Sequence, residues 1–513
     1  MLIRLSFDIF SNMALSGDEI RANRIKKLGL LKDKNINPYP AKADFSVSEI
    51  AVVREKFNKL VGKKTGIAGR VMAKRGHGAI MFLDIYDGSS AFAKAPADKV
   101  DGKLQIFIAK DKLTEGQFGL LRDTLDIGDF AAFSGKPFYT KKKEPTIEAE
   151  HWQMLSKSLR SLPEKWHGLV DVEERFRKRY LDLLMNEDAR KGFELRTNIV
   201  KELRSYLDRS GFMEVETPVL QPLYGGALAE PFKTHHRMLD MEMYLRVAPE
   251  LYLKRLLVAG FPKVYELGKN FRNEGIDMTH NPEFTTVELY AAYWDAELLK
   301  QFITASLYRI IKNIFKKTPF QFKGEKINFP KKIPSVEFWN VLERHAGIVG
   351  AENMSREDIA LRAKQFGINV ESHESKEKIA NEIFSKICRP KMIQPVFLVN
   401  HPLAISPLAK VLHGKPGQVD RFQLIIGGVE MVNGFSELND PLEQRSRMES
   451  QEKIRAAGEK ESEPMDEDFI EALEYGMPPA AGLAVSIDRL TMLLGDIHNV
   501  KEVILFPTMK PKQ

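Results

Sequence analysis

The sequence predicts an α+β protein with a small β-barrel domain near the N-terminus and a larger domain of mixed helices and strands. Three observations support this prediction. The chain has 513 residues, which is more than one hydrophobic core usually supports. Short alternating apolar runs are concentrated in residues 61–160, and from residue 176 onward long helical patterns alternate with strands.

The composition excludes several classes of protein. Hydrophobic residues make up 43% of the chain and charged residues 29%, as in ordinary globular proteins. The single cysteine, Cys388, rules out a disulfide framework or a cysteine-ligated zinc site within the chain, and it favours a reducing cytoplasm. No apolar run reaches the length of about 18 residues that a membrane span needs. The net charge of +7 is compatible with a polyanionic partner.

Residues 1–60 are predicted to form an N-terminal extension with a basic helix. Ile25, Leu28 and Leu31 recur at roughly helical spacing among lysines, and the pattern stops at a Pro-rich connector. The start of the chain has a short apolar run interrupted by charges. We therefore expect a disordered or misassigned start rather than a signal peptide.

Residues 61–160 carry five short runs of strand character, separated by glycines and charges. The runs are TGIAGRVMAKR, AIMFLDIYD, GKLQIFIAK, DIGDFAAFSGKPFYTK and PTIEAEHWQML. Five such strands in under a hundred residues predict a small barrel of the oligonucleotide-binding (OB) type. A linker is expected at 161–175, followed by the large domain at 176–513. A Lys-rich helical insertion without a recognisable catalytic motif is expected within it, at about 300–400.

The first cluster of unusual polar residues is FRNEGIDMTHNPEFTTVELYAAYWD, residues 271–295, which predicts two strands joined by a long loop. In the second strand, period-two alternation separates an apolar face, with Val287 and Leu289, from a face with Glu288 and Tyr290. A long loop bearing a histidine between two strands is typical of a nucleotide site. A solvated sheet face with surface ion pairs remains the alternative.

A second β-like run, GGVEMVNGFSELND at residues 427–440, also mixes carboxylates with an aromatic residue. Alternation places Asn433, Phe435 and Glu437 on one face. Glu430 is out of phase with them, so it can join that face only through a bulge or bend near the two glycines. Taken alone, this run is also compatible with a loop.

The third run, PPAAGLAVSIDRLTMLLGD at residues 478–496, predicts a strand that leads into a helix. One face of the strand is built only from small residues, Gly482, Ala484 and Ser486, so something must lie flat against it. Arg489 is predicted at the junction of strand and helix, where its guanidinium could bind a phosphate. A buried structural arginine is the alternative.

Together and in this order, the three clusters resemble the class II aminoacyl-tRNA synthetases, specifically the bacterial-type lysyl-tRNA synthetases. The resemblance runs from about residue 20 to the C-terminus and includes GFMEVETPVL, FRNEG, HNPEFTTVELY, APELYLKRL, NGFSELND and GLAVSIDR. It implies an antiparallel catalytic sheet flanked by helices, an OB-fold anticodon-binding domain and a homodimer.

The resemblance also implies a reaction. ATP would activate L-lysine to lysyl-adenylate and release pyrophosphate, and the lysyl group would then pass to tRNA(Lys). Arg272 matches the arginine that bridges the lysine carboxylate and the α-phosphate, and Arg489 matches the one that holds the γ-phosphate. These two are the candidate catalytic residues. Both would also bind ATP, together with Glu274, His280, Asn281, Phe284, Glu430 and Gly482.

Selection of lysine requires carboxylates that replace the water around its ammonium group. The lysine-binding positions implied by the resemblance are Gly226, Glu250, Arg272, Glu288, Tyr290, Asn433, Phe435 and Glu437. Glu250 separates this family from the related aspartyl enzymes, which carry glutamine there. A site built around a buried charge rejects uncharged analogues by roughly 10⁴ or more, so no editing domain is expected.

The expected metal cofactor is Mg²⁺, with Glu430, Gln423 and Glu437 as candidate ligands. The family usually has glutamate where this chain has Gln423, so the site loses a negative charge. We therefore hypothesise weaker metal binding, shifted toward Glu430 and the ATP phosphates. Ala484 and Ser486 also replace common glycines, which is expected to crowd the adenosine pocket slightly.

In the barrel, the resemblance assigns anticodon contacts to Arg75, Phe82, Gln105 and Glu144, and an insertion is expected at 89–103. Two alternatives to tRNA charging remain at this point. One is a paralogue that transfers lysine to a protein, although such relatives lack the barrel. The other is a catalytically inert synthetase homologue, which the loss of the metal-binding glutamate would favour.

Overall fold

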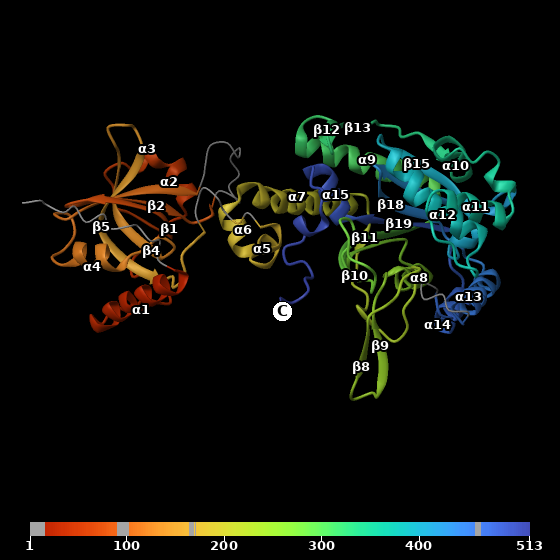
Figure 1. Ribbon diagram of the computed structural model, residues 1–513, viewed down its shortest axis with the longest axis horizontal. Helices are drawn as coiled ribbons and strands as arrows, with labels where there is room; N and C mark the ends of the chain where they lie inside the picture. Colours follow the sequence, from red (N-terminus) through yellow and green to blue (C-terminus); the bar gives the residue numbers. More distant parts are fainter. Residues whose placement is uncertain (1–15, 90–101, 164–168, 170, 457–462, 513) are drawn as a thin grey trace, which may run out of the picture. The chain divides into compact units, whose positions relative to one another are not determined.

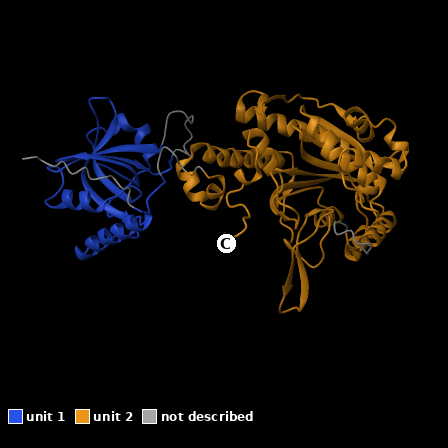
Figure 2. Ribbon diagram, viewed as in Figure 1, with its two compact units in different colours: residues 1–168 blue, residues 169–513 orange. Residues whose placement is uncertain are grey.

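The computed structural model describes residues 16–89, 102–163, 169, 171–456 and 463–512. The chain divides into two compact units, residues 1–168 and 169–513 (Figure 2). Residues 1–15 of the expected extension and most of the predicted insertion at 89–103 lie outside the described residues. Within the described ranges, no helix is long and apolar enough to cross a membrane.

The first unit is built around a closed five-stranded barrel with strand order β1-β2-β3-β5-β4 (Figure 1). All neighbouring strands are antiparallel except β3 and β5, which are parallel. Alternate residues of β2, such as Leu83 and Ile85, are fully buried inside the barrel. The strands are β1 (Thr65–His77), β2 (Ile80–Tyr86), β3 (Lys103–Ala109), β4 (Phe130–Tyr139) and β5 (Pro145–Ser156).

Short helices accompany the barrel. The basic helix predicted near the N-terminus is α1, and its first turn is closed by a capping box between Ser16 and Glu19. Arg24 of α1 donates hydrogen bonds to the backbone oxygens of Ile127, Ser158 and Arg160, which fastens α1 to the barrel. The helices are α1 (Gly17–Asp33), α2 (Ile50–Glu55), α3 (Phe57–Leu60) and α4 (Gln117–Thr124).

The second unit contains a large, mostly antiparallel sheet with the order β14-β15-β17-β18-β19-β11-β10-β6, and β16 pairs with β17. Only the outermost pairs, β6 with β10 and β14 with β15, are parallel. The strands are β6 (Met213–Glu214), β10 (Lys263–Phe271), β11 (Glu283–Ala292), β14 (Ser335–Glu337), β15 (Val396–Pro402), β16 (Val411–Leu412), β17 (Lys415–Ile426), β18 (Val429–Ser436) and β19 (Ala480–Ser486). Sheet and barrel together confirm the predicted fold class.

Long helices cover one face of the large sheet and form the main core. Leu203 of α7, Ile303 of α9 and Leu490 of α15 pack with Val287 and Leu289 of β11, all nearly inaccessible to water. The apolar face predicted for β11 is therefore the core face. The helices of this layer are α7 (Glu187–Arg209), α9 (Ala296–Phe315) and α15 (Ile487–Gly495). Two short helices, α5 (Val172–Arg177) and α6 (Arg179–Met185), precede α7.

The segment at about 300–400 contains a second hydrophobic core, in which Phe338 and Ile383 pack against Leu398 of β15. Its elements include the end of α9, a hairpin of β12 (Pro319–Phe322) and β13 (Glu325–Asn328), and β14. They continue with α10 (Phe338–Ala346), η2 (Ala351–Asn353), α11 (Arg356–Gln365), α12 (Lys376–Ile383), the π-helical turn η3 (Phe384–Cys388) and the 3-10 turn η4 (Arg389–Lys391).

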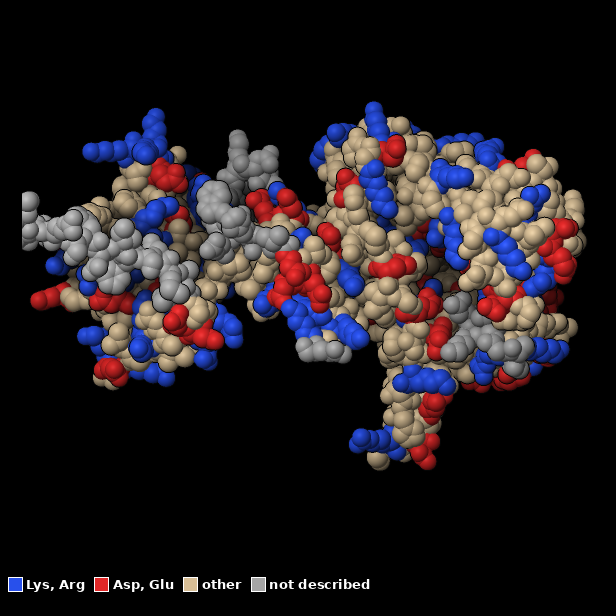
Figure 3. Space-filling view, in the orientation of Figure 1, with Lys and Arg blue, Asp and Glu red and all other residues tan. Residues whose placement is uncertain are grey.

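The remaining elements surround the other face of the sheet. A three-stranded sheet, with order β7-β9-β8, includes the projecting hairpin seen at the bottom of Figure 1. Acidic and basic side chains are interspersed over the visible surface (Figure 3). The elements are β7 (Leu220–Gln221), β8 (Lys233–His236), β9 (Met241–Leu245), α8 (Glu250–Val258), η5 (Leu403–Ile405), α13 (Pro441–Ala456), α14 (Glu467–Glu474) and η6 (Val500–Glu502).

Candidate active site

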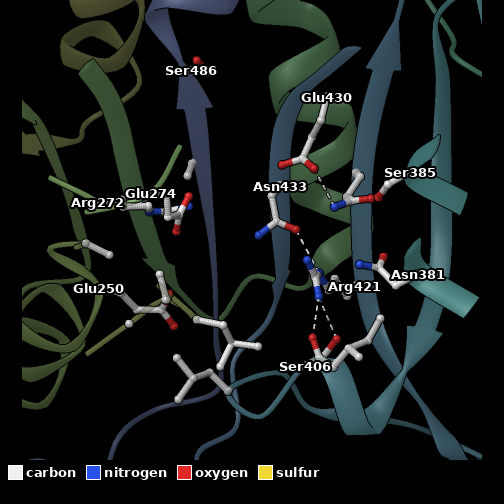
Figure 4. A pocket seen from close by; sticks show the side chains of 18 of the residues that line it. Glu250, Arg272, Glu274, Asn381, Ser385, Ser406, Arg421, Glu430, Asn433 and Ser486 are labelled. Atoms are coloured by element: carbon white, nitrogen blue, oxygen red, sulfur yellow. Dashed lines mark hydrogen bonds between the residues drawn. The ribbon is translucent and has the colours of Figure 1, made fainter. Parts of the chain in front are cut away.

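A cavity of about 600 Å³ lies over the face of the large sheet opposite the α7, α9 and α15 layer. It brings together residues from β11, β17, β18 and β19 and from the loop after β10, which are far apart in the sequence (Figure 4). The sequence-predicted residues that line it are Gly226, Glu250, Arg272, Glu274, His280, Asn281, Phe284, Glu288, Tyr290, Gln423, Glu430, Asn433, Phe435, Gly482 and Arg489. The polar face predicted for β11 is thus the cavity face.

Arg272 follows β10 directly, and its backbone N–H donates to the carbonyl oxygen of Pro282, which closes the base of the loop. The guanidinium carbon lies 5.2 Å from the centroid of the Phe284 ring, a cation–π contact that fixes its position. Burial lowers the pKa of Arg272, while the carboxylates of Glu274 and Glu288 oppose that shift. An arginine stays charged even so, and it presents a desolvated positive charge to the cavity.

The loop between β10 and β11 is held by Asp277. Its Oδ1 accepts hydrogen bonds from the backbone N–H groups of Thr279 and His280, and its Oδ2 lies 2.8 Å from His280 Nδ1. Burial alone would raise the pKa of Asp277, but these contacts lower it to about 2. His280 Nε2 lies 3.0 Å from Arg489 Nη2, so the neutral imidazole can accept from the guanidinium while Nδ1–H donates to Asp277. The loop and Arg489 are therefore coupled through one histidine.

Arg489 occupies the strand-to-helix junction predicted from the sequence. Ser486 caps α15 by accepting from the Arg489 backbone N–H, and the Arg489 side chain donates to the backbone oxygen of Glu430 at 3.1 Å. Nearby, Asp488 accepts from the Thr285 backbone and pairs with Arg196 of α7 at 2.5 Å. These contacts tie the junction to the sheet and to the helix layer.

Glu430 reaches the cavity through a bulge. In the β17–β18 pairing, Leu424 is opposite Val432 but Ile425 is opposite Glu430, so β18 has one extra residue at Met431. The predicted break in alternation is therefore confirmed. It follows a turn in which Gly427 and Gly428 both have positive φ, at 60° and 74°.

Gln423 lies beside Glu430 on the neighbouring strand. Its Nε2 donates to Glu430 Oε2 at 2.7 Å, and its Oε1 lies 3.2 Å from Nε2 of the buried His401. Burial lowers the pKa of His401 to about 3, so its imidazole is neutral. The amide nitrogen of Gln423, rather than its oxygen, therefore faces the carboxylate.

The amino-acid end of the cavity contains an unusual concentration of buried carboxyl groups. Burial and the proximity of Glu250 raise the pKa of Glu288 to about 8. Burial also raises the pKa of Glu437 to about 8, against the opposing effect of Lys254. Lys254 Nζ lies 2.7 Å from Glu250 Oε1 and 2.6 Å from Glu437 Oε2, and it is fully buried. Lys254 thus neutralises part of the negative charge of these buried carboxyl side chains.

Gly482 lies beneath this end of the cavity. A Cβ at that position would lie 2.3 Å from Cε1 of Tyr290 and 2.6 Å from Oε1 of Glu437. The small face predicted for β19 is therefore filled, at Gly482, by the tyrosine ring and the carboxylate. The missing side chain at Gly482 makes room for two of the predicted lysine ligands.

The sequence prediction missed several residues at or beside the cavity, among them Lys254, Arg421 and Glu463. Lys254 lies one helical turn after Glu250, a spacing that could have indicated the pair. Arg421 alternates with Gln423 on β17 and donates to Asn433 Oδ1 at 2.9 Å, as Figure 4 shows. Glu463 is 1% exposed, and neither of its carboxylate oxygens has a hydrogen-bond partner among the described residues. No sequence signal marks Glu463. Of the predicted set in this unit, only Glu437 does not line the cavity.

The predicted anticodon residues lie on the barrel. Arg75 and Phe82 are paired across β1 and β2, and Gln105 accepts a hydrogen bond from Thr146. The Phe82 ring lies 5.0 Å from that of Phe107, which the sequence prediction did not include. Glu144 is exposed just before β5. These side chains form a half-exposed aromatic surface with polar groups at its edges, the type of surface on which unpaired bases stack.

Comparison with known proteins agrees with this architecture. Residues 171–510 match the family described as tRNA synthetases class II (D, K and N), and residues 66–155 match the OB-fold nucleic acid binding domain. A lysine–tRNA ligase of Moorella thermoacetica is 42% identical over 97% of this chain and 99% of its own length. Those of Syntrophomonas wolfei and Carboxydothermus hydrogenoformans are each 43% identical, over 98% and 96% of this chain and 99% of their own lengths. The chain belongs to the lysine–tRNA ligase family of class II tRNA synthetases.

Proposed function

We propose that the protein activates L-lysine with ATP to form lysyl-adenylate and pyrophosphate, and then transfers the lysyl group to tRNA(Lys). One observation carries the proposal. A single cavity joins two arginines suited to phosphate, Arg272 and Arg489, to a buried group of carboxyl side chains suited to an ammonium. The membership of the chain in the lysine–tRNA ligase family supports the same reaction.

In the first step, the lysine carboxylate attacks the α-phosphate of ATP and pyrophosphate leaves. Because both reactants are anions, the protein must supply positive charge and hold them in line. Arg272 is placed for this because its guanidinium is buried and held over Phe284. We assign Arg489 to the far phosphates, with His280 setting its orientation through the 3.0 Å contact. In the second step, the terminal adenosine hydroxyl of the tRNA attacks the carbonyl carbon of the adenylate, so that the lysyl ester forms and AMP leaves.

Lysine selection rests on the buried carboxyl groups. We assign Glu250, Tyr290 and Glu437 to the ε-ammonium, and Gly226 and Glu288 to the α-amino group. Burial raises the pKa values of Glu288 and Glu437 to about 8. The ammonium group of lysine favours the ionised forms of these carboxyl groups. Binding of lysine therefore lowers their pKa values and releases protons. An uncharged analogue cannot have this effect.

The site fits Mg²⁺ only in a form shared with ATP. Within the described residues there is no group of three or more acidic, histidine or cysteine side chains that could hold a metal ion. The amide of Gln423 also turns its nitrogen toward Glu430. Mg²⁺ commonly binds through one or two carboxylates together with substrate phosphates. We therefore propose that Glu430 and the ATP phosphates hold the ion, which neutralises phosphate charge when bound, while Glu437 serves the ammonium.

The partners and location follow from the same proposal. We propose a homodimer because Met213 of the edge strand β6 and the nearby Val219 and Leu220 are exposed apolar residues in the segment that resembles the family's dimer region. Light scattering of the purified chain tests this. We also propose a cytoplasmic location. The one cysteine, Cys388, is buried, and the proposed substrates of the protein belong to translation.

Lysine-dependent exchange of pyrophosphate into ATP, measured with each of the twenty amino acids, tests activation and specificity together. Exchange with lysine alone is expected. Its absence would favour an inert homologue. Transfer to tRNA with a UUU anticodon, compared with transfer to protein, tests the second step. The relatives match this chain over both units, so neither alternative function has specific support.

A further inference from the structure

Besides Arg272, Arg421 and Arg489, the cavity is lined by Arg389, which lies within electrostatic range of Arg489 and Glu430. Arg389 belongs to the 3-10 turn η4, at the end of the helical segment in which the sequence shows no catalytic motif. Its side chain is partly buried. Asn381 and Ser385 of the same segment also line the cavity, on the side of Glu430 and Arg421 (Figure 4). The helical segment therefore supplies one wall of the predicted nucleotide site.

The backbone holds Arg389 close to Glu430. The Gly427 N–H donates to the carbonyl oxygen of Ile393 at 2.8 Å, and the Gly428 N–H donates to that of Met392 at 3.0 Å. A Cβ on Gly428 would lie 3.1 Å from the Cα of Pro390. The two-glycine turn thus lets the β17–β18 connection lie directly against the residues that follow Arg389.

Arg389 differs from its neighbour Arg421 in its contacts. Arg421 donates to Asn433 Oδ1, to the Ile405 oxygen and to Ser406 Oγ, at 2.8–2.9 Å, which is the pattern of a structural arginine. Among the residues that the structure describes, none forms a hydrogen bond or salt bridge with the Arg389 side chain. Its N–H donors are therefore available to a ligand.

The charges around Arg389 point to an anionic ligand. Burial lowers the pKa of Arg389, with Glu430 opposing this shift and Arg489 adding to it, so these groups lie within electrostatic range of each other. The nearby Gln423 is neutral and already donates to Glu430. The carboxylates of Glu382 and Asp277 also act on Arg389, but among the described residues no carboxylate forms a salt bridge with it, so its guanidinium is available to a polyphosphate.

We propose that Arg389 is a third phosphate-binding arginine, which contacts the β- and γ-phosphates of the nucleotide and lessens the need for a metal ion at this position. The inference rests on the proposed function, because it assumes that the cavity binds ATP. It also explains how a site with Gln423 in place of a carboxylate can hold a triphosphate. A smaller share of the positive charge then has to come from Mg²⁺.

Calorimetry on the full chain tests the proposal with two probes, α,β-methylene-ATP and AMP, each in EDTA and in Mg²⁺. Substitution R389M should weaken binding of the triphosphate analogue in EDTA by about tenfold or more, the usual loss for a hydrogen bond to a charged group. Binding of AMP should change by less than about twofold. Mg²⁺ should reduce the difference between the variant and the wild type.

Lys391 provides the matched control, because it belongs to the same turn and donates to the His345 carbonyl oxygen, away from the cavity. K391M removes the same charge and should leave binding of both probes unchanged. R389K should recover part of the affinity. If R389M fails to fold, R389Q keeps a polar side chain and carries the same comparison.

Two outcomes overturn the inference. In one, R389M binds the triphosphate analogue in EDTA as tightly as the wild type. In the other, it loses AMP affinity to the same degree, which means that Arg389 only supports the fold of the pocket. A wild-type protein that binds neither probe contradicts the proposed function itself. Wild-type binding with an unaffected R389M contradicts only the role of Arg389.

Discussion

Replacement of Lys254 by methionine tests the electrostatics of the ammonium site. Lys254 Nζ is fully buried between Glu250 and Glu437, at 2.7 Å and 2.6 Å from their carboxylate oxygens. Burial opposes its charge, but the two carboxylates raise the pKa of Lys254 above its ordinary value. Methionine keeps most of the side-chain volume and removes the charge, so the two carboxylates would face each other without a cation.

The expected cost is large because both partners stay buried. Removing one member of a buried ion pair costs about 3–5 kcal/mol. Protonation of Glu437 relieves part of this cost, because burial raises the pKa of Glu437 to about 8. Since that pKa is raised, the stabilising effect of protonation is present at low pH and is lost as pH rises through it. We therefore expect a loss of about 3 kcal/mol at pH 8.5 and a smaller loss at pH 6.

Thermal melting of the catalytic unit at these two pH values measures the effect, and a loss of about 3 kcal/mol corresponds to a melting temperature lower by about 5 °C. R255M is the control on the same helix, since Arg255 pairs with Asp466 at a partly exposed site, and its loss should be about 1 kcal/mol. Adding Glu437→Gln to K254M should restore stability. Melting of K254M within about 1 °C of the wild type at both pH values, which is roughly the error of the assay, refutes the reasoning.

Four further predictions follow from the site. Lysine binding at pH 7 should release up to about one proton for each carboxyl group whose pKa is raised, and Glu288→Gln should reduce this release. The release is measured as a dependence of the binding enthalpy on the ionisation enthalpy of the buffer. Glu463→Gln should raise the melting temperature more at pH 8.5 than at pH 6. Burial raises the pKa of Glu463 to about 8, so its ionisation at the higher pH destabilises the fold. An equal effect at both pH values contradicts this prediction. Gly482→Ala should raise the KM for lysine at least tenfold, since its Cβ would lie 2.3 Å from Tyr290; an unchanged KM shows that the ring can move. Gln423→Glu should lower the Mg²⁺ concentration that gives half-maximal exchange, and an unchanged requirement removes the hypothesis of weakened metal binding.

The strands of the site show how much local pattern predicts. Period-two alternation separates Val287 and Leu289 from Glu288 and Tyr290, and the structure places the first pair in the core and the second in the cavity wall. The out-of-phase Glu430 indicated a bulge, which the pairing of β17 and β18 contains. Such predictions succeed because a strand with one buried face must keep its register.

Contacts between distant segments were not predictable in the same way. Nothing in the helical segment marks Arg389 as a cavity residue, because its position depends on a two-glycine turn about forty residues later. The burial of Glu463 likewise depends on neighbours in other elements, including Gly226 and Glu250. Gly482 lines the cavity as the sequence predicts, but its close approach to the Tyr290 ring and to the carboxylate of Glu437 depends on the tertiary structure.

The sequence by itself determined the class of fold, the order of its elements and the family, because periodicity, spacing and motifs are local properties of the chain. Nearly all the site residues that it predicted in the large domain line one cavity. The tertiary structure alone decided which charges face each other. It placed Lys254 between two glutamates and left Arg389 without a partner among the described residues. The physical reason is that desolvation and Coulomb interactions depend on distance and burial in space, which no spacing along the chain specifies.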